Sequence, residues 1–231
     1  AQKLGMNVNK AKQKAVPKKD ETKSLTPGER LCIDSSSVNT RSAKKKFWIL
    51  VEDQATSMKW SLFVNNKKDQ VNPIIELIKE IHETTDGKIS FIQCDNAGEN
   101  KSLEAKMKEL GMGIKFEYTA RNTPQQNGQV ERLFATLYGK IQSMLRDANM
   151  SEKDKEIYWI EAASTATKID NLLIRKGKKK SPYFCFYKKP TFYEKHLQTF
   201  GEKGVVTKSI RKDLKSKLEN RGILCTFMGY A

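Results

Sequence analysis

The chain has 231 residues, of which 38% are hydrophobic and 9% aromatic, which favours one main globular domain with a smaller appendage. Lys and Arg number 43 against 27 Asp and Glu, and the formal net charge of +16 favours a polyanionic partner, most often nucleic acid. No apolar run approaches the ~18 residues that span a bilayer, and no signal peptide is recognisable, so we expect a soluble intracellular protein with no membrane partner.

The cysteines and histidines argue against several kinds of site. The four cysteines are scattered singly without a C-x-x-C pair, which argues against a disulfide framework and against a zinc site in this segment. The two histidines are far apart in the chain, so we expect neither a histidine-based metal site nor a Cys–His nucleophile.

The N-terminal part of the chain predicts an arm followed by three strands. Residues 1–28 are rich in lysine and lack periodic apolar positions, which is typical of an extended or disordered arm. The runs LCID, KFWILVED and MKWSLFVN then predict three strands joined by short polar links. Three strands in succession favour an antiparallel meander.

Helices and strands alternate over the next part of the chain. Apolar positions in QVNPIIELIKEIHETT recur on one helical face, and Asp86-Gly87 ends this helix. KISFIQC predicts a strand ending at Asp95, a helix closed by Gly111 follows, and IKFEYT predicts another strand. Because strands that alternate with helices pair in parallel, we expect parallel additions to the meander.

A loop, two long helices and a β-rich tail complete the chain. RNTPQQNGQ has the composition of a loop, and apolar spacings of three and four then predict a long helix from Val130 to Ala148. A second helix is expected over about residues 152–174, followed by the basic linker RKGKKKSP. The runs GVVTKS and GILCTFMGY predict a small separate β unit at the end.

Three acidic residues occupy positions from which they can meet. Asp34 ends the first predicted strand, Asp95 ends the fourth, and Glu131 begins the long helix. At about 100° per residue, Glu131 lies beside the apolar stripe of that helix, in line with Tyr138 and Gln142. In a mixed sheet these positions can converge at one edge. Other nearby acids stay open as candidates, namely Glu52, Asp53 and Glu99.

Three clustered carboxylates without histidine form an oxygen-only ligand set, which suits Mg²⁺ or Mn²⁺. Two such ions about 3.5–4 Å apart can activate an attacking oxygen and stabilise the leaving oxygen during phosphodiester displacement. The acids would also repel one another without cations.

Several motifs then point to one family. Between Asp95 and Glu131 lie 35 residues, IDSSSV carries the first acid, and CDNAGEN surrounds the second. TPQQNGQVER contains Glu131, and WILVEDQATSMKWSLFV covers the second and third strands. These stretches, with SPYFCFYKKP, LQTFG and CTFMGYA near the end, resemble the D,D-35-E integrase catalytic core of retroviruses and long-terminal-repeat retrotransposons, most closely copia-type elements.

The resemblance covers about residues 28–231. It implies an α/β, RNase H-like fold, in which helices flank a mixed five-stranded sheet and a small β-rich, SH3-like unit follows. We accordingly expect a basic arm at 1–28, the catalytic core at 29–175, and a basic linker with the β-rich unit at 176–231. The family's zinc-binding module has no counterpart here, so the chain is expected to begin after it and to be excised from a polyprotein.

The resemblance also implies an enzyme, a DNA nucleotidyltransferase and endonuclease. Asp34, Asp95 and Glu131 are the implied catalytic residues and the ligands of two Mg²⁺ or Mn²⁺ ions. Water would attack in 3′-end processing of element DNA, and a 3′ hydroxyl would attack in strand transfer into target DNA. We expect a homo-oligomer on DNA, no small-molecule cofactor, and a location in the nucleus or a cytoplasmic virus-like particle.

Four further residues are candidates for DNA contacts. Gln125 and Asn127 lie in the predicted loop, where amide side chains can reach a DNA strand, although ordinary turn chemistry explains them as well. Arg132 and Arg146 lie on the flank of the long helix, where they can meet phosphates or simply solvate the helix.

Two alternative functions stay open. The chain can be an RNase H-like endonuclease that cuts without strand transfer, against which the copia-like tail argues. It can also be a catalytically decayed or domesticated RNase H-like DNA-binding protein, against which the presence of all three acids argues.

Overall fold

The computed structural model describes residues 26–38, 45–85, 89–119, 124–191, 195–207 and 222–230, but not the side chains of residues 124–131. Most of the predicted arm therefore lies outside the described residues. Within them, no helix is both long and apolar enough to cross a membrane.

The strands are β1 (Arg30–Ser37), β2 (Phe47–Asp53), β3 (Lys59–Val64), β4 (Phe91–Asp95), β5 (Lys115–Thr119), β6 (Lys203–Thr207) and β7 (Gly222–Thr226). The helices are the short 3-10 helix η1 (Lys67–Gln70), α1 (Val71–Thr84), α2 (Gly98–Glu109), α3 (Pro124–Asp147), α4 (Glu152–Leu172) and α5 (Pro182–Tyr187).

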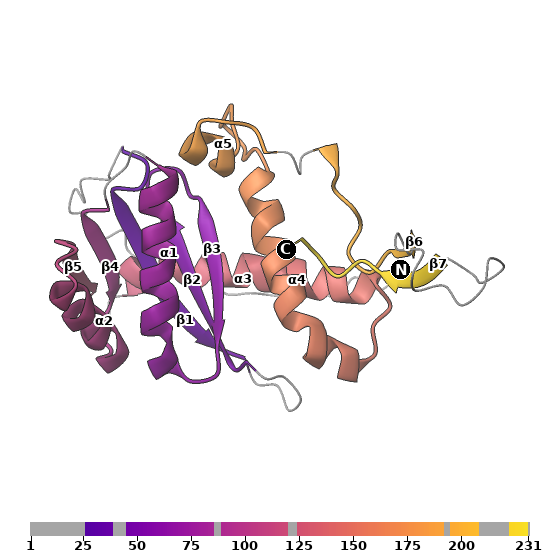
Figure 1. The fold of residues 1–231 in the computed structure, drawn as a ribbon, viewed down its shortest axis with the longest axis horizontal. Helices are drawn as coiled ribbons and strands as arrows, with labels where there is room; N and C mark the ends of the chain where they lie inside the picture. The colour runs from indigo at the N-terminus through magenta and orange to yellow at the C-terminus, as the bar shows by residue number, and fades with distance from the viewer. Residues whose placement is uncertain are drawn as a thin grey trace, which may run out of the picture.

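The central sheet has five strands in the order β3-β2-β1-β4-β5 (Figure 1). Strands β1, β2 and β3 pair antiparallel, whereas β4 and β5 extend the sheet in parallel with β1. Short links are long enough for antiparallel neighbours, while each parallel neighbour needs a helical crossover. The predicted meander with parallel additions is confirmed.

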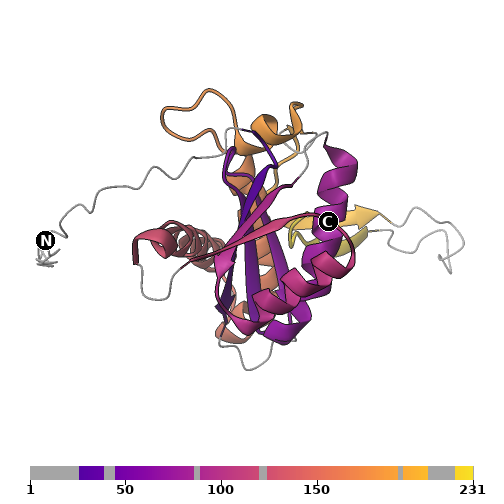
Figure 2. The ribbon, with the colours of Figure 1, turned by 90° about the vertical axis from the view of Figure 1, so that its left-hand side faces the viewer.

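Two hydrophobic cores cover the two faces of this sheet. In β2, Ile49 and Val51 belong to the core shared with α1 and α2, whereas Trp48 and Leu50 belong to the core shared with α3 and α4. Successive side chains of a strand point to opposite faces, so a strand covered on both faces is apolar almost throughout. Figure 2 shows α3 on one side of the sheet and α1 and α2 on the other. The side toward α3 and α4 is called the α3 face below.

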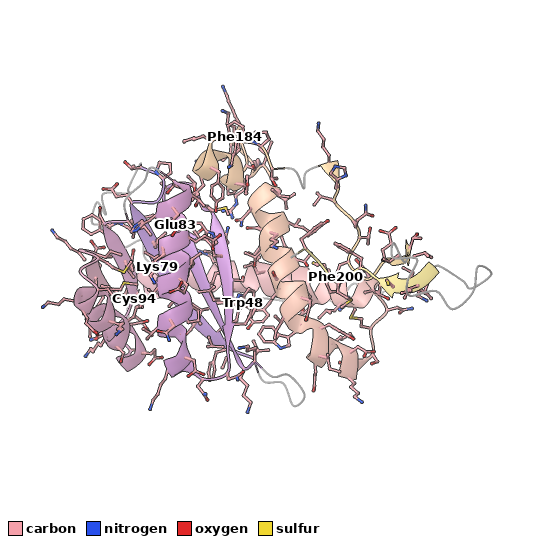
Figure 3. The ribbon with its side chains drawn as sticks, in the orientation of Figure 1. Trp48, Lys79, Glu83, Cys94, Phe184 and Phe200 are labelled. Carbon is pink, nitrogen blue, oxygen red and sulfur yellow. The ribbon has the colours of Figure 1, made fainter. Side chains whose placement is uncertain are left out.

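Trp48 fixes helix α3 on the sheet. Its side chain, labelled in Figure 3, is fully buried. The ring meets Phe134 and Tyr138 edge-on, with ring centroids 5.1 and 5.2 Å away. Edge-to-face contacts of this kind add to the free energy gained by burying the rings. Trp48 is therefore a core residue that joins β2 to α3.

Strand β1 is longer than the sequence pattern predicts. The run LCID predicts a strand that ends at Asp34, but β1 continues to Ser37. The polar residues that follow Asp34 pair with Ile49, Trp48 and Phe47 of the apolar strand β2, so their backbone groups stay in the ladder. Asp34 therefore lies inside a strand and not at its end.

Helix α3 begins earlier than predicted. RNTPQQNGQ reads as a loop, yet residues 124–129 are helical and Pro124 is the first residue of α3. Proline is well tolerated there because the first amides of a helix have no intrahelical acceptor, and its fixed φ suits a helix. Residues 121–123 lie outside the described part of the chain.

The C-terminal part contributes a helix and two strands. Helix α5 is capped by Ser181, and its Phe186 is buried in the core of the sheet with its ring edge-on to Trp60, 5.0 Å between centroids. The two predicted β runs form strands β6 and β7, which pair antiparallel at the opposite end of the molecule from β5 (Figure 1). The SH3-like character of this unit and the domain boundaries stay predictions.

Candidate metal and catalytic site

The register of β1 and β4 sets Asp34 level with Asp95. The parallel ladder pairs Leu31 with Ile92 and Cys32 with Gln93. Two residues further along both strands, the same register reaches Asp34 on β1 and Asp95 on β4. The paired residues of β1 and β4 end at Cys32 and Gln93, and Asp34 and Asp95 follow two residues later on strands that lie about 4.8 Å apart where they pair.

The strand positions of both aspartates belong to the α3 face. Ile33 and Cys94, which precede the two aspartates in the strands, lie in the core on the opposite face. Because side chains alternate along a strand, Asp34 and Asp95 share the face on which the Cys32 thiol donates to the side-chain Oε1 of Gln93, 3.6 Å away. Asp34 is half-buried, and Asp95 is exposed.

Neutral N–H groups are among the donors to each aspartate. The Asp34 Oδ1 accepts from the backbone N–H of Ser35 at 2.8 Å. The Asp95 Oδ1 accepts from the side-chain amide of Asn100 at 2.6 Å, and Asn100 also donates to the Asp95 backbone carbonyl at 3.1 Å. Neutral donors orient a carboxylate without cancelling its charge.

Helix α3 is tied to the same strand that carries Asp34. The hydroxyls of Ser36, two residues beyond Asp34, and Tyr138 on α3 are 3.1 Å apart. Burial raises the pKa of Tyr138 and outweighs the hydrogen bond with Ser36, so the phenol stays protonated. Position 131 precedes Tyr138 by seven residues, about two helical turns, and so lies on the same side of α3.

The side chain of Glu131 lies outside the described part of the structure, as do those of Gln125 and Asn127. Among the described residues, no three His, Cys, Asp or Glu side chains gather as a metal would require. The structure thus places Asp34 and Asp95 on adjacent strands and the backbone of Glu131 in the first turns of α3. That the three carboxylates come together at one site stays a prediction.

Comparison with known proteins gives relatives of both sequence and fold. No protein-family model matches the chain. The retrovirus-related Pol polyprotein from transposon TNT 1-94 of Nicotiana tabacum is 30% identical over 191 residues, 80% of this chain and 14% of that protein. The Pol polyprotein from transposon RE2 of Arabidopsis thaliana is 27% identical over 188 residues, 80% of this chain and 12% of that protein. The chain spans only a small part of these relatives.

Two solved structures share the fold. A chain of the simian T-cell lymphotropic virus intasome, solved in complex with the PP2A regulatory subunit B56 gamma, has a TM-score of 0.57 and 15% identity, with 87% of this chain and 68% of that chain covered. The HTLV-2 integrase catalytic core domain, solved with magnesium in a trimeric form, has a TM-score of 0.52 and 16% identity, with 70% of this chain and 98% of that chain covered. The chain is homologous to retrotransposon Pol polyproteins and has the RNase H-like fold of an integrase catalytic core. The predicted fold class is confirmed.

Two of the other acidic candidates in this fold make contacts with neighbouring residues that hold the local structure. Asp53 is fully buried and accepts from the backbone N–H of Gly28 at 2.9 Å and from the hydroxyl of Thr56 at 2.6 Å. These bonds fix the turn that follows β2. Glu99 lies in the first turn of α2, where its carboxylate is 3.7 Å from the Lys67 ammonium.

Glu52 belongs to a buried ionic cluster on the α3 face. We use this name for Glu52, Lys59, Lys140, Asp170 and Arg175. The Asp170 carboxylate on α4 lies 2.9 Å from the Lys59 ammonium and 3.0 Å from the Arg175 guanidinium, and it also accepts from Lys140 of α3. The Glu52 carboxylate is 3.8 Å from Lys59. This integrase-fold core therefore contains two groups of acids with opposite surroundings.

Sequence reasoning missed this cluster and the Asn100 contact. The available signals were a lysine inside the apolar run of β3 and an aspartate on the stripe of α4. Both predict a buried charge that needs a partner, but neither identifies the partner.

The two arginine candidates for DNA contacts are exposed on α3. Arg132 follows Glu131 directly, whereas Arg146 is in the last turn of the helix, about 21 Å further along at 1.5 Å per residue. Their exposure leaves both able to meet phosphates. Their role stays a prediction.

Proposed function

We propose that this chain is the catalytic core of a retrotransposon integrase, which processes the 3′ ends of element DNA and joins them to target DNA. The observation that supports the proposal is the parallel pairing of β1 with β4 in an integrase-type sheet, because its register, continued two residues beyond the Cys32–Gln93 pair, brings Asp34 and Asp95 to the same level. Glu131 is the third member, on the helix that packs against the same face.

The donor set of the proposed site fits Mg²⁺ or Mn²⁺. Asp34, Asp95 and Glu131 supply carboxylate oxygens only, which hard divalent cations prefer. A related core has been solved with magnesium, which supports the same class of metal here. When bound, two such ions would activate the attacking oxygen and stabilise the leaving oxygen.

The chain's own residues would supply position and orientation. Asp34 is paired with Leu50 of β2 and Asp95 with Thr119 of β5, so these ladders would hold the backbone of both aspartates in place. Helix α3, held through Tyr138 and Trp48, would bring Glu131 to the same edge. In processing, water attacks a phosphorus near the DNA end and the P–O3′ bond breaks. In strand transfer, the freed 3′ hydroxyl attacks a target phosphorus and displaces another 3′ oxygen.

DNA would bind across the basic surface of this face. The net charge of +16 favours a polyanion, and Arg132 and Arg146 lie exposed on α3. Gln125 and Asn127 in its first turns would contact the DNA end. If phosphate contacts dominate, affinity should fall steeply and linearly in a plot of log K against log salt. Arg146→Gln should reduce the slope by about one, as loss of one phosphate contact predicts.

An assembly on DNA and an intracellular location complete the proposal. One structural neighbour is a trimeric form and another is an intasome, which supports assembly of this chain into an oligomer on DNA. A site of action in the nucleus or in a cytoplasmic virus-like particle is consistent with the relationship to retrotransposon Pol proteins.

A strand-transfer assay tests the function. The 231-residue chain is incubated with a pre-processed, labelled DNA end, a target duplex and Mg²⁺ or Mn²⁺. Joined product is expected from the wild type, and Asp95→Asn and Glu131→Gln should abolish it. Glu109→Gln, an exposed acid at the end of α2, is the matched control and should leave joining unchanged.

The other outcomes assign the alternative functions. Nicked DNA without joined product, lost in Asp95→Asn, would identify an endonuclease without strand transfer. DNA binding with neither nicks nor joined product would identify a decayed or domesticated DNA-binding protein. Cleavage that survives Asp95→Asn would refute the metal site.

A further inference from the structure

The carboxylate of Asp95 is held by a buried amide from α2. Asn100 is only 5% exposed, and its Nδ2 donates to both the side-chain Oδ1 and the backbone carbonyl of Asp95, at 2.6 and 3.1 Å. A donor shared by the side chain and the backbone of one residue restricts that carboxylate's rotation. Asn100 thus links the start of α2 to the end of β4.

A second buried amide fixes the direction of this contact. Gln70, at the end of η1 and 1% exposed, donates from Nε2 to the Asn100 Oδ1 at 2.8 Å. Because the Asn100 oxygen is taken by this donor, its NH₂ group must face Asp95. A reversed Asn100 would set its oxygen against the Asp95 carboxylate and its NH₂ against the Gln70 NH₂.

The arrangement is costly for stability alone. Among the described residues, the buried Oε1 of Gln70 has no hydrogen-bond partner. A buried polar atom without a partner costs about 1–3 kcal/mol. Three polar groups from η1, β4 and α2 are nonetheless placed in line, which is the pattern of an outer shell that orients a ligand.

We propose that Asn100, anchored by Gln70, is a positioning residue that presents Asp95 to a divalent cation. The Asn100 amide occupies Oδ1 and sets the plane of the carboxylate, so that the second oxygen is directed for coordination. This inference rests on the proposed function, because it assigns Asp95 to a metal. Asn100 acts through Asp95 and does not itself touch DNA or the reacting atoms.

Cation binding without DNA separates this role from a structural one. Mn²⁺ is titrated into the metal-free 231-residue chain and free Mn²⁺ is followed by electron paramagnetic resonance. Asn100→Leu should weaken Mn²⁺ binding about 10–100-fold, the usual cost of losing an outer-shell partner. Gln70→Leu, which leaves the Asn100–Asp95 contact but removes its anchor, should weaken binding by a smaller factor.

The matched control is another buried asparagine with two hydrogen bonds. Asn171 on α4 accepts from the Lys59 N–H at 2.9 Å and donates to the Lys59 carbonyl at 2.7 Å. Asn171→Leu should lower the denaturation midpoint as Asn100→Leu does, with Mn²⁺ affinity unchanged. Gln70→Leu/Asn100→Leu replaces both amides by apolar groups, which protects folding and should still weaken Mn²⁺ binding.

The measured Mn²⁺ affinities distinguish the positioning role of Asn100 from the proposed metal site. Wild-type affinity in both Asn100→Leu and the double variant would overturn the positioning role and leave the integrase assignment intact. The metal site and this inference would both be overturned if the wild-type chain bound no Mn²⁺, or if Asp95→Asn bound Mn²⁺ as tightly as the wild type does.

Discussion

Two groups of acidic side chains lie on the α3 face of the central sheet, and they differ in what surrounds them. Asp34 and Asp95 are half-buried and exposed, and the donors described at their carboxylates are an N–H group and an amide. Glu52 and Asp170, in the buried ionic cluster, lie within 4 Å of lysine or arginine side chains. Cationic side chains of the protein thus surround Asp170, whereas Asp95 is exposed to solvent and its described carboxylate contact is with the neutral Asn100 amide. Exposure and the charge of the described partners distinguish this candidate metal site from the ion network better than the number of acids does.

Removing a carboxylate should have opposite effects in the two groups, and the largest effect concerns activity. Asp34→Asn should lower DNA joining by more than about 100-fold, beyond the cost of losing an outer-shell partner. In metal-free buffer the variant should be at least as stable as the wild type, because two neighbouring carboxylates repel. Joining assays and urea unfolding in a chelator measure both. If Asp34→Asn joined DNA as well as the wild type does, the proposed difference between the two groups of acids would be contradicted.

Loss of Asp170 should destabilise the fold and spare the chemistry. Asp170→Asn leaves Lys59 buried without its main counter-ion, which costs about 3–5 kcal/mol when a buried pair is broken. Urea unfolding measures the change. Glu76→Gln removes the exposed pair with Lys79 and should change the free energy of unfolding by less than about 0.5 kcal/mol. Equal effects of the two substitutions would show that the buried ionic cluster is not structural.

Asp170 should also make the free energy of unfolding fall more steeply as the pH is lowered. Burial alone would raise the pKa of Asp170, but the Lys59 charge and the hydrogen bonds from Lys140 and Lys59 outweigh it and hold the pKa well below the usual range. A pKa depressed by folding contributes stability above the unfolded value of about 3.9, and this contribution is lost as the pH falls below it. Between about pH 5 and 2 the wild type should therefore lose stability faster than Asp170→Asn. If the free energies of unfolding of the wild type and Asp170→Asn changed in parallel with pH, the lowered pKa of Asp170 would be contradicted.

The link between α3 and β1 should contribute modestly to stability and more visibly to joining. Tyr138→Phe keeps the ring against Trp48 but loses the bond to Ser36, which should cost about 1 kcal/mol. Tyr118→Phe loses a similar bond, to Glu104 on the opposite face, and serves as the control. Joining should fall several-fold in the first variant only, measured at a temperature where both are folded. Equal joining rates would show that the link does not position α3.

The smallest effect is expected at Glu52. Burial raises the pKa of this carboxyl despite the Lys59 charge 3.8 Å away, and its Oε2 is buried without a hydrogen-bond partner among the described residues. A charged Glu52 is therefore costly at neutral pH, since a raised carboxyl pKa means that folding favours the protonated form. Glu52→Gln should leave the free energy of unfolding within about 1 kcal/mol of the wild type or increase it. A loss as large as that of Asp170→Asn, measured by urea unfolding, would contradict this.

The sequence by itself determined most of the elements and their types, but not the short helices η1 and α5. Apolar periodicity located the strands, the long helices and the β-like tail, because burial on one or both faces imposes a local repeat that short stretches display. It also located Asp95 at the end of a strand and the spacing to Glu131. The start of α3 escaped this reasoning, since proline and polar residues suit a first helical turn as well as a loop.

Only the tertiary structure decided which residues meet. The register of β1 against β4 sets Asp34 level with Asp95. Lys59 finds Asp170 across 111 residues of sequence, and Gln70 finds Asn100 across 30. No local pattern encodes such pairs, because they follow from strand order and from how helices pack on the sheet. A one-residue slip in register would turn Asp34 to the opposite face, away from α3.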